Sequence, residues 1–169
     1  LPFSKISGEE VGYVAISSEK PEPKILRGLM EALPPLANVM GIGVSPDGRK
    51  IAFGSNSGIY IYDIDQDKVI QYIYPEITGT ISLIEYVDEE KLAVVYLSGD
   101  LGEVSPITGY YLSEQHLVIY DSASGNQIGV ISNPHSESIT EIKSIDGFRL
   151  VTASLDGVIK VWDLSGNQL

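Results

Sequence analysis

The C-terminal stretch 139–164 decides the fold, and it reads ITEIKSIDGFRLVTASLDGVIKVWDL. It holds three segments with alternating residues or short apolar runs, separated by Asp146-Gly147 and Asp156-Gly157. Alternation with a period of two is typical of half-buried strands. Asp-Gly pairs are typical of tight turns, because glycine accepts a positive φ. The stretch therefore predicts three antiparallel strands joined by two hairpin turns.

The same pattern occurs twice upstream, in residues 39–64 and 81–122. A polar turn and a fourth short strand, KVIQYIY or QIGVIS, follow these two copies. The third predicted strand of every copy ends in an aromatic residue and an aspartate: Tyr62-Asp63, Tyr120-Asp121 and Trp162-Asp163. The last two aspartates are 42 residues apart, and the first two are 58 apart because of an insertion. Four antiparallel strands in roughly 40–45 residues are the unit of a β-propeller blade.

One segment, 134–168, resembles a WD repeat of the β-propeller family. That family has a hydrogen-bonded tetrad of His, Ser or Thr, Asp and Trp. The resemblance implies that its members here are His135, Thr152, Asp156 and Trp162. Their spacing makes His135 a structural residue in preference to a catalytic base or a metal ligand. The other copies are degenerate at the corresponding places, with Phe53, Ser57 and Tyr62 in one and Val94, Ser98 and Tyr120 in the other.

We therefore predict an all-β fold of β-propeller blades with four antiparallel strands each, in an incomplete ring. The expected units are a partial blade at 1–29, a blade at 36–75, a blade at 80–132 with an insertion at 99–115, and a WD-type blade at 134–169. All of them belong to one propeller domain. Closed propellers have four to eight blades. We expect more chain, a partner or a second copy to complete the ring.

The amino-acid composition excludes several classes of function and of structural feature. The net charge is −12, and the 11 Lys and Arg residues do not form the basic face that nucleic-acid binding needs. The acidic balance either keeps a β-rich surface soluble or attracts basic partners. The absence of cysteine excludes disulfides and thiolate metal sites. No apolar run reaches the roughly 20 residues of a membrane-spanning helix.

No sequence motif for catalysis or for a cofactor is present. The alternating Asp63, Asp65 and Asp67 are similar to the start of a Ca²⁺ loop, but the turn glycine and the distal glutamate of such a loop are not in place. We interpret them as a solvated turn. The sequence thus predicts no enzyme activity, no cofactor and no metal.

The insertion at 99–115 is the candidate contact surface. It lies between a second and a third strand, where the loops of a WD-type blade project from one face of the ring. Neighbouring tyrosine and acidic side chains suit a basic protein segment. A neutral elaboration, or aromatic residues packed on their own blade, is the alternative. The candidate residues are Asp100, Glu103, Tyr110, Tyr111 and Glu114.

Three functions remain open. The first is a non-catalytic platform that binds other proteins, as part of a larger protein or complex. The second is an extracellular or surface propeller, because residues 51–73 resemble the repeats of YVTN-type propellers. The third is a propeller enzyme whose active site lies outside this segment. We favour the first.

Overall fold

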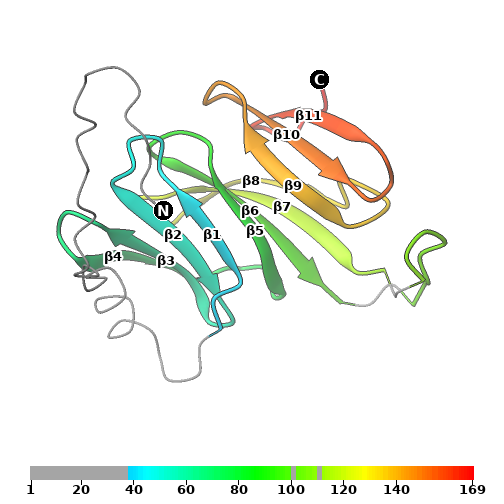
Figure 1. Ribbon diagram of the computed structural model, residues 1–169, viewed down its shortest axis with the longest axis horizontal. Helices are drawn as coiled ribbons and strands as arrows, with labels where there is room; N and C mark the ends of the chain where they lie inside the picture. The colour runs from blue at the N-terminus through cyan, green and yellow to red at the C-terminus, as the bar shows by residue number, and fades with distance from the viewer. Residues whose placement is uncertain (1–37, 100–101, 110–111) are drawn as a thin grey trace, which may run out of the picture.

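The computed structural model describes residues 38–99, 102–109 and 112–169, so the partial blade expected at 1–29 lies outside the described residues (Figure 1). The described residues form eleven β-strands and no helix. The strands are β1 (Gly41–Val44), β2 (Lys50–Ser55), β3 (Gly58–Asp63), β4 (Lys68–Ile73), β5 (Thr80–Tyr86), β6 (Lys91–Ser98), β7 (Glu114–Asp121), β8 (Gln127–Ser132), β9 (Ile139–Ser144), β10 (Arg149–Ser154) and β11 (Ile159–Asp163).

Consecutive strands pair antiparallel in three separate sheets. The strand orders are β1-β2-β3-β4, β5-β6-β7-β8 and β9-β10-β11. A bridge between Trp162 and Gln168 adds the last residues of the chain to β11. The sheets follow one another like the sectors of a fan, with β1 beside β5 and β5 beside β9 (Figure 1). The described residues therefore form an arc that does not close.

The sequence repeat is also a repeat of strand register. Trp162 pairs with Leu150, and Tyr120 pairs with Leu92. In each case the aromatic residue precedes the last aspartate of the third strand, and its partner is the second residue of the second strand. A shift by one residue would turn every side chain to the opposite face. The aromatic-Asp dipeptide therefore marks an equivalent position in each sheet.

Two apolar layers join the sheets. One layer contains Ile61 and Val94 and lies between the first and second sheets. The other contains Val95, Leu150 and Trp162 and lies between the second and third sheets. Val94 and Val95 are neighbours in β6 but belong to different layers, because successive strand residues point to opposite faces. The second sheet is thus buried on both faces, which explains its continuous apolar run KLAVVYL.

Small residues let the first sheet approach the second closely. A Cβ atom added at Gly43 would lie 3.1 Å from the carbonyl oxygen of Ile84. A Cβ atom added at Gly54 would lie 2.7 Å from Cγ2 and 3.0 Å from Cβ of Ile81. Ile81 is 2% exposed and has little room to move. These glycines are therefore required by packing between sheets.

Aspartate side chains hold the turns at one end of every sheet. In the turns between first and second strands, Asp47, Asp88 and Asp146 each accept backbone N–H groups from the residues that follow. In the turns between third and fourth strands, Asp63 and Asp121 accept N–H groups in the same way. Side-chain hydrogen bonds from Ser45, Lys91 and Arg149 to the first three aspartates, together with these backbone hydrogen bonds, favour the ionised carboxylate. The pKa of each of the five aspartates is therefore lowered. Five of the 23 acidic residues therefore have a structural role in turns.

We predict that Gly54→Ala destabilises the protein by about 1–3 kcal/mol, because the added methyl group overpacks the layer against Ile81. Urea denaturation followed by the fluorescence of Trp162, the single tryptophan, measures the effect. Ile81→Ala is the matched partner in a double-mutant cycle, since it removes the atoms that the new methyl group would meet. The double variant should be more stable than the sum of the single effects. Additive effects would contradict the packing explanation.

Candidate functional site

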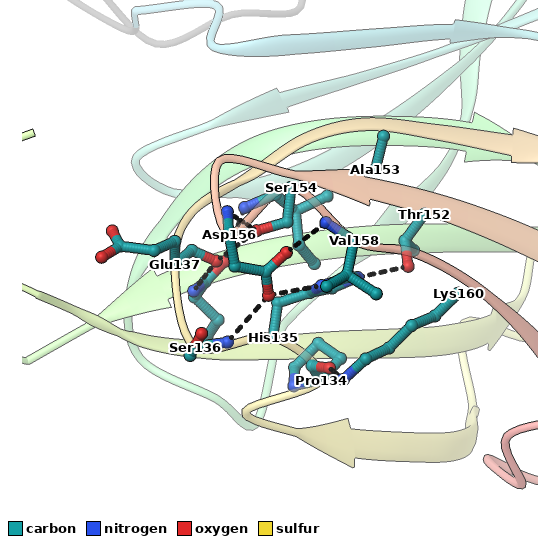
Figure 2. A network of polar contacts seen from close by, with 12 residues as sticks. Pro134, His135, Ser136, Glu137, Thr152, Ala153, Ser154, Asp156, Val158 and Lys160 are labelled. Carbon is teal, nitrogen blue, oxygen red and sulfur yellow. Dashed lines mark hydrogen bonds and ion pairs between the residues drawn. The ribbon is translucent and has the colours of Figure 1, made fainter. Parts of the chain in front are cut away.

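A hydrogen-bonded network joins the loop before β9 to the β10–β11 hairpin (Figure 2). Nδ1 of His135 lies 2.9 Å from Oδ2 of Asp156, and Nε2 lies 2.7 Å from the Thr152 hydroxyl oxygen. The indole N–H of Trp162 donates to the same Thr152 oxygen at 2.9 Å. His135 belongs to the β8–β9 loop, Asp156 to the turn after β10, and the other two to strands. The structure thus brings together the four side chains that the sequence grouped.

The directions of these bonds follow from what each group can donate. The Trp162 indole only donates, and the Asp156 carboxylate only accepts. With one proton on the imidazole, the Trp162 indole N–H donates to the Thr152 hydroxyl oxygen. The Thr152 hydroxyl then donates to Nε2 of His135. His135 in turn donates from Nδ1 to Asp156. Each donor therefore has an acceptor, which a buried polar network needs in order to stabilise a fold.

The Asp156 carboxylate completes the network at the turn. Its Oδ1 accepts the backbone N–H of Val158 at 2.9 Å, and its Oδ2 accepts that of Ser136 at 3.2 Å in addition to His135. Burial raises the pKa of Asp156, but the Val158 N–H and the His135 hydrogen bond lower it by more. The pKa therefore lies below its usual value, and the ionised carboxylate is the form that the fold stabilises.

Trp162 is contacted by two further groups. The His135 ring meets it edge-on, with centroids 6.5 Å apart, and the Lys160 ammonium lies 5.7 Å from its centroid. Lys160 also donates to the carbonyl oxygen of Pro134 at 2.5 Å. His135 is 4% exposed and Thr152 is fully buried, so the network faces the protein interior. Its geometry suits fixing a loop to a hairpin better than contacting a bound molecule.

The sequence model of one family, described as "WD domain, G-beta repeat", matches residues 125–163. The match contains all four residues of the network and all four strands from β8 to β11. Residues 125–163 are therefore similar to a WD repeat. The matched segment begins one strand before the third sheet, because its first strand, β8, belongs to the second sheet.

Two solved structures share the arrangement of sheets. One is a chain in the crystal structure of the mitotic checkpoint complex, with a TM-score of 0.59 and 18% identity over 78% of this chain and 36% of that chain. The other is the crystal structure of RRP9 WD40 repeats, with a TM-score of 0.60 and 14% identity over 81% of this chain and 39% of that one. At these identities the likeness concerns the fold. The predicted propeller blades in an unclosed ring are confirmed. A search of curated proteins gave no match.

The chain spans less than two fifths of the length of each of these two chains. Its second sheet lacks the WD network. There Val94 occupies the place of Thr152 and has no hydroxyl group to offer. Tyr120 occupies the place of Trp162, and its hydroxyl lies 3.2 Å from that of Tyr96. The aromatic position is kept in both sheets, while its polar partner differs.

The insertion lies between β6 and β7. The two strands pair as far as Ser98 opposite Glu114, so Glu114 and Gln115 belong to β7 and the insertion ends before them. Glu103 is exposed, and the side chain of Glu114 is 48% exposed. The candidate residues Asp100, Tyr110 and Tyr111 lie outside the described residues.

A buried carboxylate that the sequence did not indicate attaches the insertion to the third sheet. The Ser105 hydroxyl donates to Oε1 of Glu137 at 2.6 Å. The Gln115 side chain donates to the Glu137 carbonyl oxygen at 2.8 Å and accepts the backbone N–H of Ile139 at 2.9 Å. Ser105, Gln115 and Glu137 are each at most 4% exposed. No sequence pattern links Ser105 to Glu137, because they are 32 residues apart and adjoin different sheets.

The described residues hold no group of three or more His, Asp or Glu side chains placed to bind a metal ion. Of the three alternating aspartates, Asp65 pairs with Arg49 at 3.7 Å, Asp67 accepts the hydroxyl of Tyr62, and Asp63 accepts backbone N–H. Within the same described residues, no helix is long and apolar enough to cross a membrane.

We predict that Thr152→Val destabilises the protein by about 2–4 kcal/mol, because it leaves two buried groups, of Trp162 and His135, without their shared partner. Thr152→Ser is the matched control, since it keeps the hydroxyl and removes one methyl group, at a cost of about 1 kcal/mol. Chemical denaturation followed by Trp162 fluorescence compares the two. Equal losses would mean that packing, and not the hydrogen bonds, is what Thr152 contributes.

The lowered pKa of Asp156 predicts acid sensitivity. A carboxyl whose folded pKa is depressed contributes stability above its unfolded value of 3.8, and this contribution is lost as the pH falls through the lower folded pKa. Asp156→Asn should therefore lower the free energy of unfolding at pH 7. The difference between variant and wild type should shrink below pH 3.8. Denaturant titrations at a series of pH values test this, and a difference that is independent of pH would contradict it.

Proposed function

We propose that the chain is a non-catalytic platform that binds other proteins, as part of a larger protein or complex. We also propose that residues 36–75, 80–132 and 134–169 are successive blades of one propeller domain, with a partial blade at 1–29. The sheets at 41–73, 80–132 and 139–163 support this division. The WD match and the WD40 neighbours favour the platform over a YVTN-type or enzymatic propeller.

One observation carries the proposal: the insertion is held in place on the adjacent blade. Ser105 donates to the buried Glu137 of the β8–β9 loop, and Ser154 donates to the carbonyl oxygen of the same residue at 3.0 Å. The insertion and the β10–β11 turn therefore flank one loop at the same end of the sheets. The described part of the insertion is held by these contacts, and a segment that is held in place loses less entropy when it binds a partner.

The side chains around this loop support a mixed apolar and acidic contact. Val104 and Ile107 of the insertion are 54% and 59% exposed, and Leu155 of the β10–β11 turn is 42% exposed. Glu103 is exposed beside them. Apolar side chains next to carboxylates suit a protein segment that carries both apolar and basic residues. Asp100, Tyr110 and Tyr111 remain proposed contact residues on the sequence alone.

We propose that the tetrad positions the contact surface. His135 and Asp156 fix the β8–β9 loop, which also contains Glu137, the residue that anchors the insertion. The tetrad of His135, Thr152, Asp156 and Trp162 would thus position the contact surface without touching the partner. One of the solved WD40 neighbours is itself a chain of a multiprotein complex, which is in keeping with a platform role.

We predict that Glu103→Lys combined with Glu114→Lys weakens binding of co-purified partners at least tenfold, because charge reversal repels a basic segment. Asp65→Lys is the matched control, since Asp65 is exposed in the β3–β4 turn at the opposite end of the strands. Affinity purification of the full chain with quantitative mass spectrometry measures partner recovery. Partners that survive the double reversal, or that are lost equally with Asp65→Lys, would contradict the proposed surface.

The register of β6 and β7 allows a sharper variant. Because Ser98 pairs with Glu114, residues 99–113 can be replaced by an Asn-Gly turn that closes the hairpin. This replacement should abolish partner recovery while the Trp162 fluorescence keeps its folded value. Removing the loop leaves the buried Glu137 carboxylate without Ser105, its hydrogen-bond donor. A second variant that also carries Glu137→Gln removes this buried charge and should restore the stability lost with the loop. Partner recovery by both folded variants would refute the platform surface.

A further inference from the structure

A solvent-open cavity of about 300 Å³ lies between the end of β4 and the β7–β8 turn, at the edge of the layer between the first two sheets. It is separate from the insertion and from the WD network. Tyr120, which is almost fully buried, lines its inner side. Its rim is formed by side chains from both sheets, among them Tyr72, Tyr74, Glu76, Asn126 and Gln127.

A row of aromatic side chains on the face of the first sheet opposite Ile73 ends at Tyr72 and Tyr74, two of the residues that line the cavity. Phe53 stacks on Tyr60 at 5.3 Å, Tyr60 meets Tyr72 at 4.7 Å, and Tyr72 meets Tyr74 edge-on at 5.6 Å. The Tyr72 hydroxyl also donates to the carbonyl oxygen of Ser57. Tyr74 is the outer end of this row and is 79% exposed. An exposed aromatic ring that is already held in place offers contact area at a low cost in side-chain entropy.

The residues that line the cavity carry negative charge only. Glu76 is exposed at the rim, and none of the residues that line the cavity is a lysine or an arginine. Its carboxylate therefore has no cationic neighbour within the cavity wall. The net charge of −12 adds to the attraction for a cation. Aromatic rings next to an unneutralised carboxylate form a chemically specific site for a cationic group.

We propose that this cavity between the first two sheets binds an arginine side chain of a partner protein. A guanidinium group stacks on an aromatic ring and at the same time donates two parallel hydrogen bonds to a carboxylate. Tyr74 provides the ring and Glu76 the carboxylate. The side-chain amide oxygens of Asn126 and Gln127 on the opposite rim can accept the remaining guanidinium N–H groups. A lysine ammonium lacks the planar fork and would use only part of this arrangement.

The proposal goes beyond the platform function, because it assigns a second site on a different part of the molecule. The insertion follows β6, whereas the cavity lies at the end of β4 and at the β7–β8 turn. Variants at Glu103 therefore test the first site, and variants at Glu76 test the second. Either assignment can fail without the other.

The experiment uses the full chain and three blocked pentapeptides with a central arginine, citrulline or lysine between glycine and serine. Backbone amide chemical shifts in two-dimensional NMR follow each titration. The arginine peptide should give saturable shifts at Tyr74 and at Gly125 to Gln127, and the neutral citrulline peptide should bind at least fivefold more weakly. Lysine should fall between them. Glu76→Gln and Tyr74→Ala should each weaken arginine binding several-fold, and both residues are exposed, so the fold is retained.

Asp65→Asn is the matched control, since it removes the same charge at an exposed position that is not among the residues lining the cavity, and it should leave the arginine titration unchanged. Equal binding of the arginine and citrulline peptides would overturn the role of charge. Equal binding of arginine and lysine would overturn the assignment to a guanidinium group. Shifts that persist in Glu76→Gln and Tyr74→Ala would overturn the site itself.

Discussion

A four-stranded meander has two faces, and the rest of this structure depends on how both faces are buried. The second sheet satisfies this requirement most fully, because an apolar layer covers each of its sides. Hydrophobic burial is not directional, so the layers alone do not fix how one sheet is rotated against the next. Gly54, which Ile81 approaches closely, and the directional bonds of the WD repeat supply that specificity.

The polar network and the turn aspartates change the interpretation of the acidic composition. From the sequence, the charge indicated either solubility or attraction of basic partners. The structure adds a third use, because Asp47, Asp88 and Asp146 accept backbone N–H groups of the turns that they begin. Acidic residues without this structural use, such as Glu76 and Glu103, are therefore the ones that remain for recognition.

Local pattern explains what the sequence predicted well. Strand alternation, Asp-Gly turns and the spacing of His135 to Trp162 are short-range features, and they indicated the propeller fold and the network residues. β7 begins at Glu114, inside the predicted insertion 99–115, and local pattern did not indicate that Gln115 would be buried. The contact of Ser105 with Glu137 was missed because it depends on the packing of two sheets. The same holds for the cavity, whose walls come from β4 and from a turn some 50 residues later in the chain.

In the first sheet, a single residue accounts both for the absence of the polar network and for the start of an aromatic surface. Phe53 occupies the place that Thr152 has in the WD repeat, and a phenyl ring there removes the hydroxyl that the network requires. The same ring stacks on Tyr60 and so begins the row of aromatic side chains that reaches the exposed Tyr74. Tyr62, in the place of Trp162, donates to Asp67 of its own turn. A blade that gives up the tetrad therefore needs another source of order, and in this sheet the aromatic row provides it and extends to the molecular surface.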